Sequence, residues 1–567
     1  MGVGATDSDA RLLAAVGDLS EAPTHFSPCD DVHCGGVLLA IPALLSCGLL
    51  TYCSRFFKLP SGYYGVRHIF MILAFMALCR IKSIEGLASC SPGEWGKLLG
   101  LDRSPATKTL RKKVALLAPQ AEKWAAELSE FWMDSNPDQA GTLYVDGHTR
   151  VYHGKQTKLP RHHVARQRLC MRATTDYWVN GFDGLPFFKV NCAVDPGMIE
   201  VLEKEIVPVL EETVPNQPTQ EQLDENPLVS RFRIIFDREG YSPAFFKRMQ
   251  EKRIACQTYK KFVTDLWPEN EFTNHEVKLI SGETVEMRLA ERGVLLGSKS
   301  SDQLWVREIR KLTKDGRQVS IVSTEWQATP AEIIGPQLGR WYQENFFKYG
   351  RQHFDFDRLT DYKLETVCET TKVTNPAWRK LDGAVRKLAS KLYKKKAKLC
   401  DYTLGNGLNG KEIESYMENT FALGNEIEKD ITRLAELKKE RKEHSRKIEI
   451  QDLPEKDQFM KLSHRTKHFS DTLKVIAYRA ETAMSETIRN DLGKHHRDES
   501  RRFIRTLYTT DANIRPDPNE KKLIVELHSL ATPKDNRIAA KLCEKLNETE
   551  IVYPGTDLVL FYKMVSP

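Results

Sequence analysis

The sequence lacks the cysteine patterns that define small metal-binding or disulfide-bonded proteins. Its 12 cysteines include no Cys-x-x-Cys pair, and the closest two, Cys29 and Cys34, have no second pair nearby. This spacing does not provide the ligands of a structural zinc site. Scattered cysteines in a chain of this length are typical of a reduced, cytosolic protein. The first 31 residues are polar and acidic and contain no secretion signal, so we expect a cytoplasmic protein.

Long apolar runs are also scarce. The 19 residues at positions 35–53 carry no charge and would be long enough to cross a bilayer, but they include Pro42 and Gly48. The next apolar stretch, residues 69–79, is too short to span. We therefore expect two apolar helices packed on each other in a helical domain, and no association with a membrane.

Charge of one sign is not in large excess, because the net charge is only +7. The basic residues are concentrated, however. Residues 376–400 hold nine Lys or Arg against one acid, and residues 151–172 hold six with no acid. Such concentrations suggest a polyanionic partner, since binding to phosphates releases counterions; for either run alone, a solvated helix face is the simpler explanation. The candidate phosphate contacts in these runs are Lys155, Lys158, Arg161, Lys394, Lys395 and Lys396.

At 567 residues the chain exceeds the size of one hydrophobic core, so we expect several domains. Hydrophobic residues make up 41% and charged residues 28%, a balance typical of globular rather than disordered proteins. The expected divisions are a disordered leader (1–30), a helical domain (31–128), an α/β core in two parts (129–259 and 330–367) separated by a β-rich insertion (260–329), a basic helical and coiled-coil region (368–505), and a small α/β piece (506–567).

Part of the helical domain resembles a helix-turn-helix. Residues 93–99 predict a short helix that buries Trp95, and Gly100 can take the left-handed position of the turn. Ser104 can cap a second helix that has proline at its first position. An exposed basic first half is what a recognition helix in the major groove of DNA needs, whereas an ordinary helical hairpin with a basic surface is the alternative. The basic residues of this helix are Lys108, Arg111 and Lys112.

After the helical domain the hydrophobic pattern changes to the alternation of β-strands. Residues 142–153, 167–179 and 184–194 predict three strands that can pair as a meander. Residues 231–237 and 254–259 predict two more strands, each preceded by a helix. Three paired strands followed by helix, strand, helix and strand is the order of a ribonuclease H-like core. We therefore expect an α/β ribonuclease H-like fold, flanked by helical regions.

The following segment, residues 260–329, interrupts this core. It contains four alternating segments joined by Gly or Asp turns and predicts a β-rich insertion, after which helix resumes at Pro330. Residues 368–505 are predominantly helical and charged. Two apolar seams in this region are typical of coiled-coil packing, one formed by Leu381, Val385, Leu388, Leu392 and Leu399 and the other by Ile427, Ile431 and Leu434.

Three acids lie at positions on the predicted strands and helix where a metal site could form. Asp146 and Asp237 lie at or near the ends of predicted strands, and Glu344 lies within a predicted helix; the spacings are 91 and 107 residues. Phosphodiester cleavage by two metal ions needs carboxylates that converge on ions about 4 Å apart. Magnesium prefers oxygen ligands. A single aspartate at a strand end is more often a turn residue, but the combination of three favours a metal site.

The sequence around these acids resembles the three acidic blocks of DDE transposases of bacterial insertion sequences. The segments are YVDG, IIFDREGYSP and RWYQENFFKYGRQHF, and the resemblance covers about residues 140–365. The subgroup with a β-strand insertion has the signature Tyr-x2-Arg-x3-Glu-x6-Lys. Here Arg340 and Glu344 match in register, whereas Gln337 replaces the tyrosine and Arg351 replaces the lysine. An α-helix would place positions 340, 344, 348 and 351 on one face.

The resemblance implies a transposase that cleaves and transfers DNA strands at the ends of a mobile element. Its Asp146, Asp237 and Glu344 would be both the catalytic and the metal-binding residues, holding two Mg²⁺ (or Mn²⁺) ions. The partners would be double-stranded DNA, as terminal inverted repeats and as target, with several copies of the chain on the DNA in a nucleoid-associated location. Arg340, Lys348 and Arg351 would contact phosphates. Trp305 could stack on an unpaired base, although core packing is the simpler expectation for it.

Two other readings remain open. Another ribonuclease H-like nuclease, such as a resolvase, would share the acids but not the insertion or the Arg-x3-Glu-x6-Arg block. A domesticated, inactive DNA-binding protein would lack the chemistry, and the intact acids argue against it. A purely structural coiled-coil protein would leave the three acidic blocks unexplained.

Overall fold

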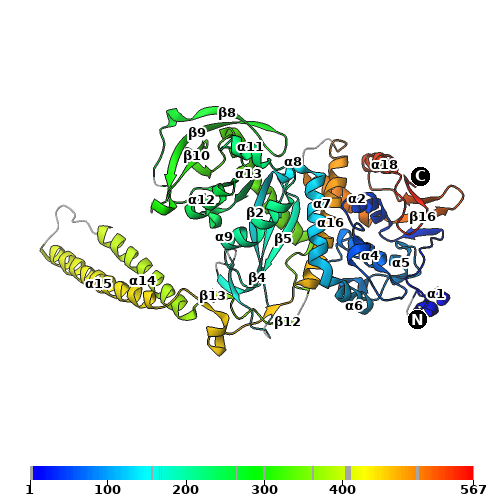
Figure 1. Cartoon of the computed structure of the whole chain (residues 1–567), viewed down its shortest axis with the longest axis horizontal. Coiled ribbons are helices and arrows are strands. Elements are labelled where there is room, and N and C mark those ends of the chain that lie inside the picture. Colours follow the sequence, from blue (N-terminus) through cyan, green and yellow to red (C-terminus); the bar gives the residue numbers. More distant parts are fainter. Residues whose placement is uncertain are drawn as a thin grey trace.

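The computed structural model describes residues 4–565 except 155–156, 165–166, 168, 264, 298–299, 361–362, 402–409 and 493–496. Lys155, one of the predicted phosphate contacts, lies outside the described residues. Figure 1 shows a broad body that contains both ends of the chain on one side. From its other side projects a long antiparallel hairpin formed by α14 (Pro376–Asp401) and α15 (Gly410–Glu443).

The two ends of the chain fold together. Strand β1 (Cys29–Val32) pairs antiparallel with β16 (Ala512–Asp517), which pairs with β17 (Lys522–Leu527); β17 in turn pairs in parallel with β18 (Val559–Met564). Helix α18 (Pro533–Asn547) packs beside this sheet. The prediction that residues 506–567 form a separate piece is therefore wrong, because their sheet is completed by a strand from the other end of the chain.

The leader is also ordered, contrary to expectation. It contains helix α1 (Ser8–Val16), and Arg11 of this helix pairs with Asp102 at 2.5 Å. The backbone N–H groups of Thr6 and Asp7 donate to the same carboxylate. Arg11, Tyr63 and these N–H groups hold the pKa of Asp102 below its usual value although burial opposes the shift. A charge pair between residues so far apart in the sequence holds the leader in place.

The helical part of the body is built on apolar segments. Helix α4 (Val66–Leu78) is almost completely buried. The short helices η1 (Gly35–Ala40) and α2 (Ile41–Ser46) pack on each other, and both α2 and α4 pack against α16 (Arg465–Ile488). In the described part of the chain, no helix has the length and apolar character needed to span a membrane. The remaining short helices here are α3 (Cys53–Phe56) and η2 (Ile84–Ser89), and they are followed by the longer α7 (Ala121–Ser135) and by α8 (Pro137–Ala140).

The segment that resembles a helix-turn-helix has two helices with a longer connection than predicted. They are α5 (Pro92–Lys97), which buries Trp95, and α6 (Thr107–Leu117). Ser104 is buried and does not cap α6, because the helix begins only at Thr107 and Ala106 occupies the N-cap position. Helix α6 presents Lys108, Arg111 and Lys112 at the surface, and Arg111 lies 3.4 Å from Glu85.

The central sheet has ten strands. Strands β2 (Thr142–Val151), β4 (Leu169–Asn180) and β5 (Pro186–Cys192) pair antiparallel in the order β2-β4-β5, and β3 (Arg161–Val164) pairs with the start of β4. On the other side of β2, β6 (Phe232–Phe236) and then β7 (Ile254–Tyr259) are parallel to it. Helices α9 (Met198–Val201), α10 (Val207–Thr213), α11 (Gln220–Glu225) and α12 (Pro243–Glu251) lie in the connections.

The predicted insertion extends this sheet. Strands β8 (Thr273–Lys278), β9 (Thr284–Leu296), β10 (Leu304–Leu312) and β11 (Gln318–Ser323) lie in the segment where the pattern predicts strands. They form an antiparallel array whose last strand, β11, pairs with β7. Helix α13 (Pro330–Tyr349) then runs back beneath the array towards β2 (Figure 1).

The region 368–505 does not form one unit. The hairpin α14–α15 buries a seam in which Leu392 faces Ile427 and Leu434. Ile431 is 44% exposed, so its predicted place in the seam is wrong, and Leu437 is buried instead. Helix α16 (Arg465–Ile488), by contrast, is buried in the body, and α17 (Arg497–Thr509) packs on it.

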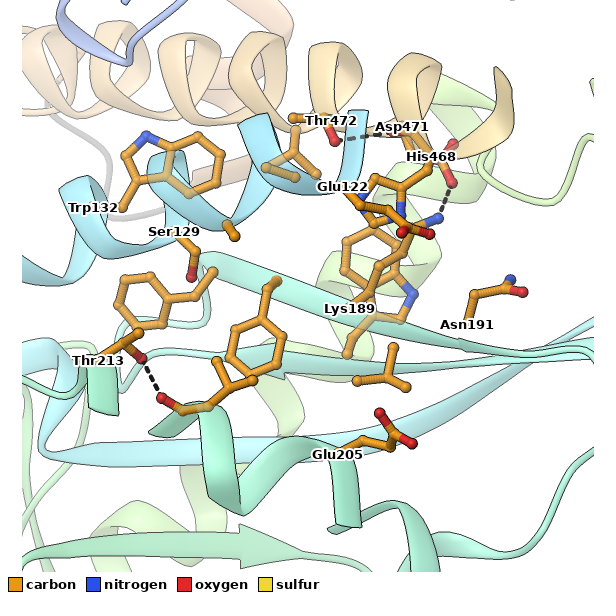
Figure 2. A pocket seen from close by; sticks show the side chains of 18 of the residues that line it. Glu122, Ser129, Trp132, Lys189, Asn191, Glu205, Thr213, His468, Asp471 and Thr472 are labelled. Atoms are coloured by element: carbon orange, nitrogen blue, oxygen red, sulfur yellow. Dashed lines mark hydrogen bonds and ion pairs between the residues drawn. The ribbon is translucent and has the colours of Figure 1, made fainter. Parts of the chain in front are cut away.

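A network of buried charges joins α16 to the central sheet. Asp176 of β4 accepts from Arg150 of β2 at 2.8 Å and lies 3.4 Å from Lys189 of β5. Lys189 also reaches Asp471 of α16, as Figure 2 shows, and Lys467 pairs with the same carboxylate. All five side chains are at most 5% exposed. Burial alone would raise the pKa of Asp176, but Arg150 and Lys189 lower it to about 2.

This network predicts the effect of neutralising its acid on α16. Replacing Asp471 by Asn leaves Lys189 and Lys467 buried with less compensating charge, which should destabilise the fold by about 3–5 kcal/mol. Unfolding by urea, followed by tryptophan fluorescence, measures the change. The matched control is Asp557→Asn, which breaks the exposed pair with Lys521 and should change stability by less than about 1 kcal/mol. Equal effects of the two substitutions would contradict a stabilising role for the network.

Candidate active site

Asp146 and Asp237 lie side by side on the central sheet. Val145 of β2 pairs with Phe236 of β6, so the next residues along the two parallel strands are the two aspartates. Asp146 is in the middle of β2 rather than at its end. The pairing between β2 and β6 ends there, and beyond it β2 continues with β4 alone.

Asp237 is held by the turn that follows its strand. One of its carboxylate oxygens accepts the N–H of Glu239 at 2.7 Å and thereby caps the short helix η5 (Arg238–Gly240). Its carbonyl oxygen accepts the hydroxyl of Thr258 from β7 at 2.9 Å. The backbone of Asp237 is therefore fixed on both sides.

Two polar side chains fix helix α13 over the same part of the sheet. The hydroxyl of Tyr144 on β2 donates to the carbonyl of Pro336 at 2.9 Å. The buried amide of Gln343 donates to the carbonyl of Trp178 at 3.1 Å and to Asn180 on β4 at 2.8 Å. Gln343 directly precedes Glu344 and is a positioning residue that the sequence analysis missed, because an isolated glutamine in a helix gives no signal of burial.

Arg340 connects the third acid to the first. Its guanidinium lies 3.4 Å from the carboxylate of Asp146 and pairs one turn along α13 with Glu344. The Arg340 side chain is 17% exposed and that of Glu344 is 46% exposed. The predicted pair of Arg340 and Glu344 on one helix face is present, and the same arginine also reaches β2 across 194 residues of sequence.

The charges around Asp146 change its acidity. Burial raises the pKa of Asp146 to about 7, and Asp237 and Glu344 add to this rise, while Arg340 and a hydrogen bond from the N–H of Gly147 oppose it. Both other predicted acids therefore act on Asp146 through space. The site holds more negative charge than its single arginine compensates, which is an environment that favours cation binding.

In the residues that the structure covers, no three His, Cys, Asp or Glu side chains form a group that could hold a metal ion. The carboxylates of Asp146 and Glu344 are both engaged by Arg340. Metal binding by the three acids therefore stays a prediction.

The remaining positions of the predicted signature differ in their surroundings. Gln337 is buried against Gln257 of β7 and points into the contact between helix and sheet. Lys348 is exposed. Arg351 lies in a π-helical turn, η8 (Gly350–Phe354), so the α-helical spacing that placed it on the face of Glu344 does not continue to it.

His148 forms an ion pair with Asp357 next to the acids. His148, two residues beyond Asp146, contacts Asp357 at 2.5 Å and stacks on the ring of Phe347 at 5.1 Å. Burial would raise the pKa of Asp357, but its bond to His148 lowers it. This pair connects the segment after α13 to β2.

Trp305 is not part of a core. It lies on β10 with 58% of its surface exposed, and its ring passes within about 4 Å of the place where a side chain on Gly293 would begin. The expectation of core packing is wrong: Trp305 is exposed near the start of β10, although Arg307 and Ile309 on the same face of the strand are buried. An exposed tryptophan remains available to a partner.

The two basic runs meet at the base of the hairpin. Lys158, Arg161, Arg172 and Arg379 line a cavity of about 220 Å³, so residues from both runs lie together. Farther along α14, Lys394 and Lys396 are exposed.

The predicted phosphate contact at Lys395 is wrong for the free chain. Lys395 pairs with Asp430 of α15 at 2.7 Å and with Glu426 at 2.8 Å. Its ammonium group therefore serves the contact between the two helices of the hairpin. A lysine run on a two-helix hairpin must direct some of its members towards the partner helix, and the sequence of α14 alone does not identify them.

The cavity in Figure 2 contains none of the predicted site residues. It has a volume of about 430 Å³ and lies between α7, β5, α10 and α16, beside the buried charge network. Its walls include Trp132, Phe187 and Lys189.

Comparison with known proteins identifies the family. A search of curated proteins finds no match. A family model described as "Transposase protein" matches residues 2–566, which is nearly the whole chain. The match includes the helical body, the central sheet with its acids and the projecting hairpin. The chain therefore belongs to this family of transposase proteins.

Proposed function

We propose that this transposase is of the DDE type and that Asp146, Asp237 and Glu344 are its catalytic carboxylates. It would cleave and transfer DNA strands at the ends of a mobile element. The observation that carries the proposal is the contact of Arg340 with both Asp146 and Glu344, next to the strand that ends at Asp237. Residues from three distant parts of the sequence thus meet at one edge of the sheet.

The topology supports a ribonuclease H-like core. The strand order β5-β4-β2-β6-β7, with the first three strands antiparallel and the last two parallel to β2, agrees with the order expected from the sequence. In such a mixed sheet, acids near the carboxyl ends of the paired segments of the parallel strands β2 and β6 lie next to each other. A helix later in the chain can add a third acid. Helix α13 occupies that place.

The donor set suits magnesium or manganese. Asp146, Asp237 and Glu344 offer carboxylate oxygens, which hard divalent cations prefer. Burial is the main cause of the raised pKa of Asp146, and the negative charges of Asp237 and Glu344 add to it. Two bound ions would activate the attacking oxygen and stabilise the leaving oxygen of a phosphodiester. In the chain alone, Arg340 supplies the positive charge that keeps Asp146 and Glu344 together. Arg340 would then be free to bind a DNA phosphate once divalent cations neutralise the acids.

Glu344→Gln tests the catalytic assignment. The substitution removes a charge but almost no volume, so cleavage of a substrate that carries the element's terminal repeat should fall by orders of magnitude with Mg²⁺. DNA binding should stay within about twofold. Gel analysis of cleavage and a binding assay in EDTA measure the two effects. The matched control is Glu251→Gln at the exposed end of α12, which should cleave normally. Full cleavage by the Glu344 variant would exclude this triad.

The pKa of Asp146 predicts a pH dependence in metal binding. Because the folded-state pKa of about 7 lies above the usual value, the metal-free fold loses stability as pH rises through 7, while the carboxylate becomes available to a cation. Thermal stabilisation by Mg²⁺ should therefore increase between pH 6 and pH 8 and then level off. Thermal unfolding with and without Mg²⁺ measures it. Asp146→Asn should abolish the trend, and an unchanged trend in that variant would assign it to another group.

The hairpin predicts a non-specific contribution to DNA affinity. Replacing Lys394 and Lys396 with Gln should weaken binding to all duplex sequences alike and reduce the slope of log affinity against log salt by about one to two. Lys395→Gln is the matched control, since its ammonium is bound to Asp430 and should not contribute to the slope. Filter binding at several salt concentrations measures the slopes. A slope unchanged in the double variant would make this surface an ordinary solvated helix face.

A further inference from the structure

A third cavity lies between the helical body and the segment that follows α13. It has a volume of about 360 Å³, within the range of small-ligand sites. One side of it is apolar, with Leu73 and Met76 from α4, Val114 from α6 and Leu473 from α16. These are side chains against which a flat, uncharged group can pack.

The other side of the cavity is cationic. Lys82, Arg111, Arg358 and Lys474 line it and come from four different segments of the chain. The acid among the lining residues, Glu85, lies 3.4 Å from Arg111. Of the other three cations, Arg358 lies 3.9 Å from Asp355, whereas Lys82 and Lys474 have no ion pair in the described part of the chain.

Lys474 is a buried ammonium with few partners. Its residue is 9% exposed, and its hydrogen bond among the described residues goes to the carbonyl of Asp355 at 3.3 Å. The nearby carboxylate of Asp471 is already bound by Lys189 and Lys467. Burial lowers the pKa of Lys474, and an anion in the cavity would favour its charged form.

The lining of the cavity also includes an uncharged polar residue, Thr360. The hydroxyl oxygen of Thr360 is buried and has no hydrogen-bond partner in the part of the chain that the structure covers. Buried hydroxyl groups are normally paired, so an unpaired one that lines a cavity points to a ligand. This observation is independent of the charges.

We propose that this cavity binds one nucleotide of an unpaired DNA strand, with its phosphate against Lys82, Arg358 and Lys474 and its base against Leu73 and Met76. A phosphate alone would leave the apolar side in contact with water, and an uncharged apolar ligand would offer no anionic oxygen to the ammonium groups of Lys82 and Lys474. Bases in a duplex are stacked and cannot enter a cavity of this size. The occupant is therefore a nucleotide from a single strand.

The position of the cavity fits a role beside the reaction. Arg358 follows Asp357, which contacts His148, two residues from Asp146. The inference rests on the proposed function for the source of the unpaired strand, since strand cleavage and transfer expose single-stranded ends. Nucleotide binding itself requires no cleavage and can be measured without divalent cations.

Competition binding with the full chain in EDTA tests the proposal. A fluorescent oligothymidylate is the probe, and thymidine 5′-monophosphate, inorganic phosphate and a duplex of the same length are the competitors. The mononucleotide should compete better than phosphate, and the oligothymidylate should bind more tightly than the mononucleotide. If inorganic phosphate competed as well as the mononucleotide, the cavity would bind anions without recognising the base. Binding of the mononucleotide as tight as that of the strand would assign the site to a free nucleotide. Either result would overturn the proposal.

Variants at the rim locate the site. Arg358→Gln and Lys82→Gln change exposed side chains and should each weaken oligothymidylate binding about tenfold while changing duplex binding by less than about threefold. Leu73→Gln should weaken binding of the oligothymidylate but not of phosphate. Arg537→Gln, which removes the same charge from an exposed position on α18, is the control and should have no effect. Equal losses for single strand and duplex would overturn the proposal.

Glu344→Gln separates this inference from the proposed function. That variant should bind the oligothymidylate as the original chain does, whether or not it cleaves DNA. If Glu344→Gln cleaves normally, the catalytic assignment fails while the nucleotide site stands. If the rim variants bind normally but Glu344→Gln does not cleave, the nucleotide site fails while the catalytic assignment stands.

Discussion

The architecture depends on the charges buried between the central sheet and α16. Taking Asp176, Asp471, Lys189 and Lys467 out of water is unfavourable for each alone, and only their mutual contacts offset it. Asp176 and Lys189 lie on β4 and β5, and Asp176 is bound by Arg150 of β2, the strand that carries Asp146. Asp471 and Lys467 lie on α16, which follows the projecting hairpin in the sequence. The sheet and the helical body must therefore form together, because either part alone would hold charged side chains without their partners. A family match that runs through both parts agrees with this interdependence.

Local patterns were sufficient to predict the strands of the central sheet that lie around Asp146 and Asp237. The alternation of apolar residues around Asp146 and Asp237 predicts β-strands, and the spacing of Arg340 and Glu344 predicts one helix face. What local patterns cannot supply is register. Only the parallel pairing of β2 with β6 shows that the two aspartates are neighbours. Only the bonds of Gln343 to β4 show how closely α13 is fixed over them.

The features that sequence reasoning got wrong share a physical cause. The order of the leader depends on Arg11 and Asp102, and the terminal sheet depends on the pairing of β1 with β16; both are contacts between residues far apart in the chain. The partner of Lys395 is on another helix. Composition and periodicity show which face of a helix or strand is apolar and which is polar. They do not show which distant segment of the chain packs against that face. The same limit explains the cavity lined by Arg358 and Lys474, whose walls come from four segments and carry no common motif.

Arg340 gives the candidate site a stable state in the absence of divalent ions. Three carboxylates on adjacent elements would otherwise repel one another and displace α13 from the sheet. An arginine suits this place better than a lysine, because its planar group carries several N–H donors and can bind two carboxylates at once, and because it stays charged at any physiological pH. Its contacts with Asp146 and Glu344 are also reversible. Once cations neutralise the acids, the same guanidinium can turn to a phosphate oxygen without leaving an acid unpaired. A single side chain would then link cation binding to the docking of DNA, and the raised pKa of Asp146 is consistent with the excess negative charge on which such a link depends.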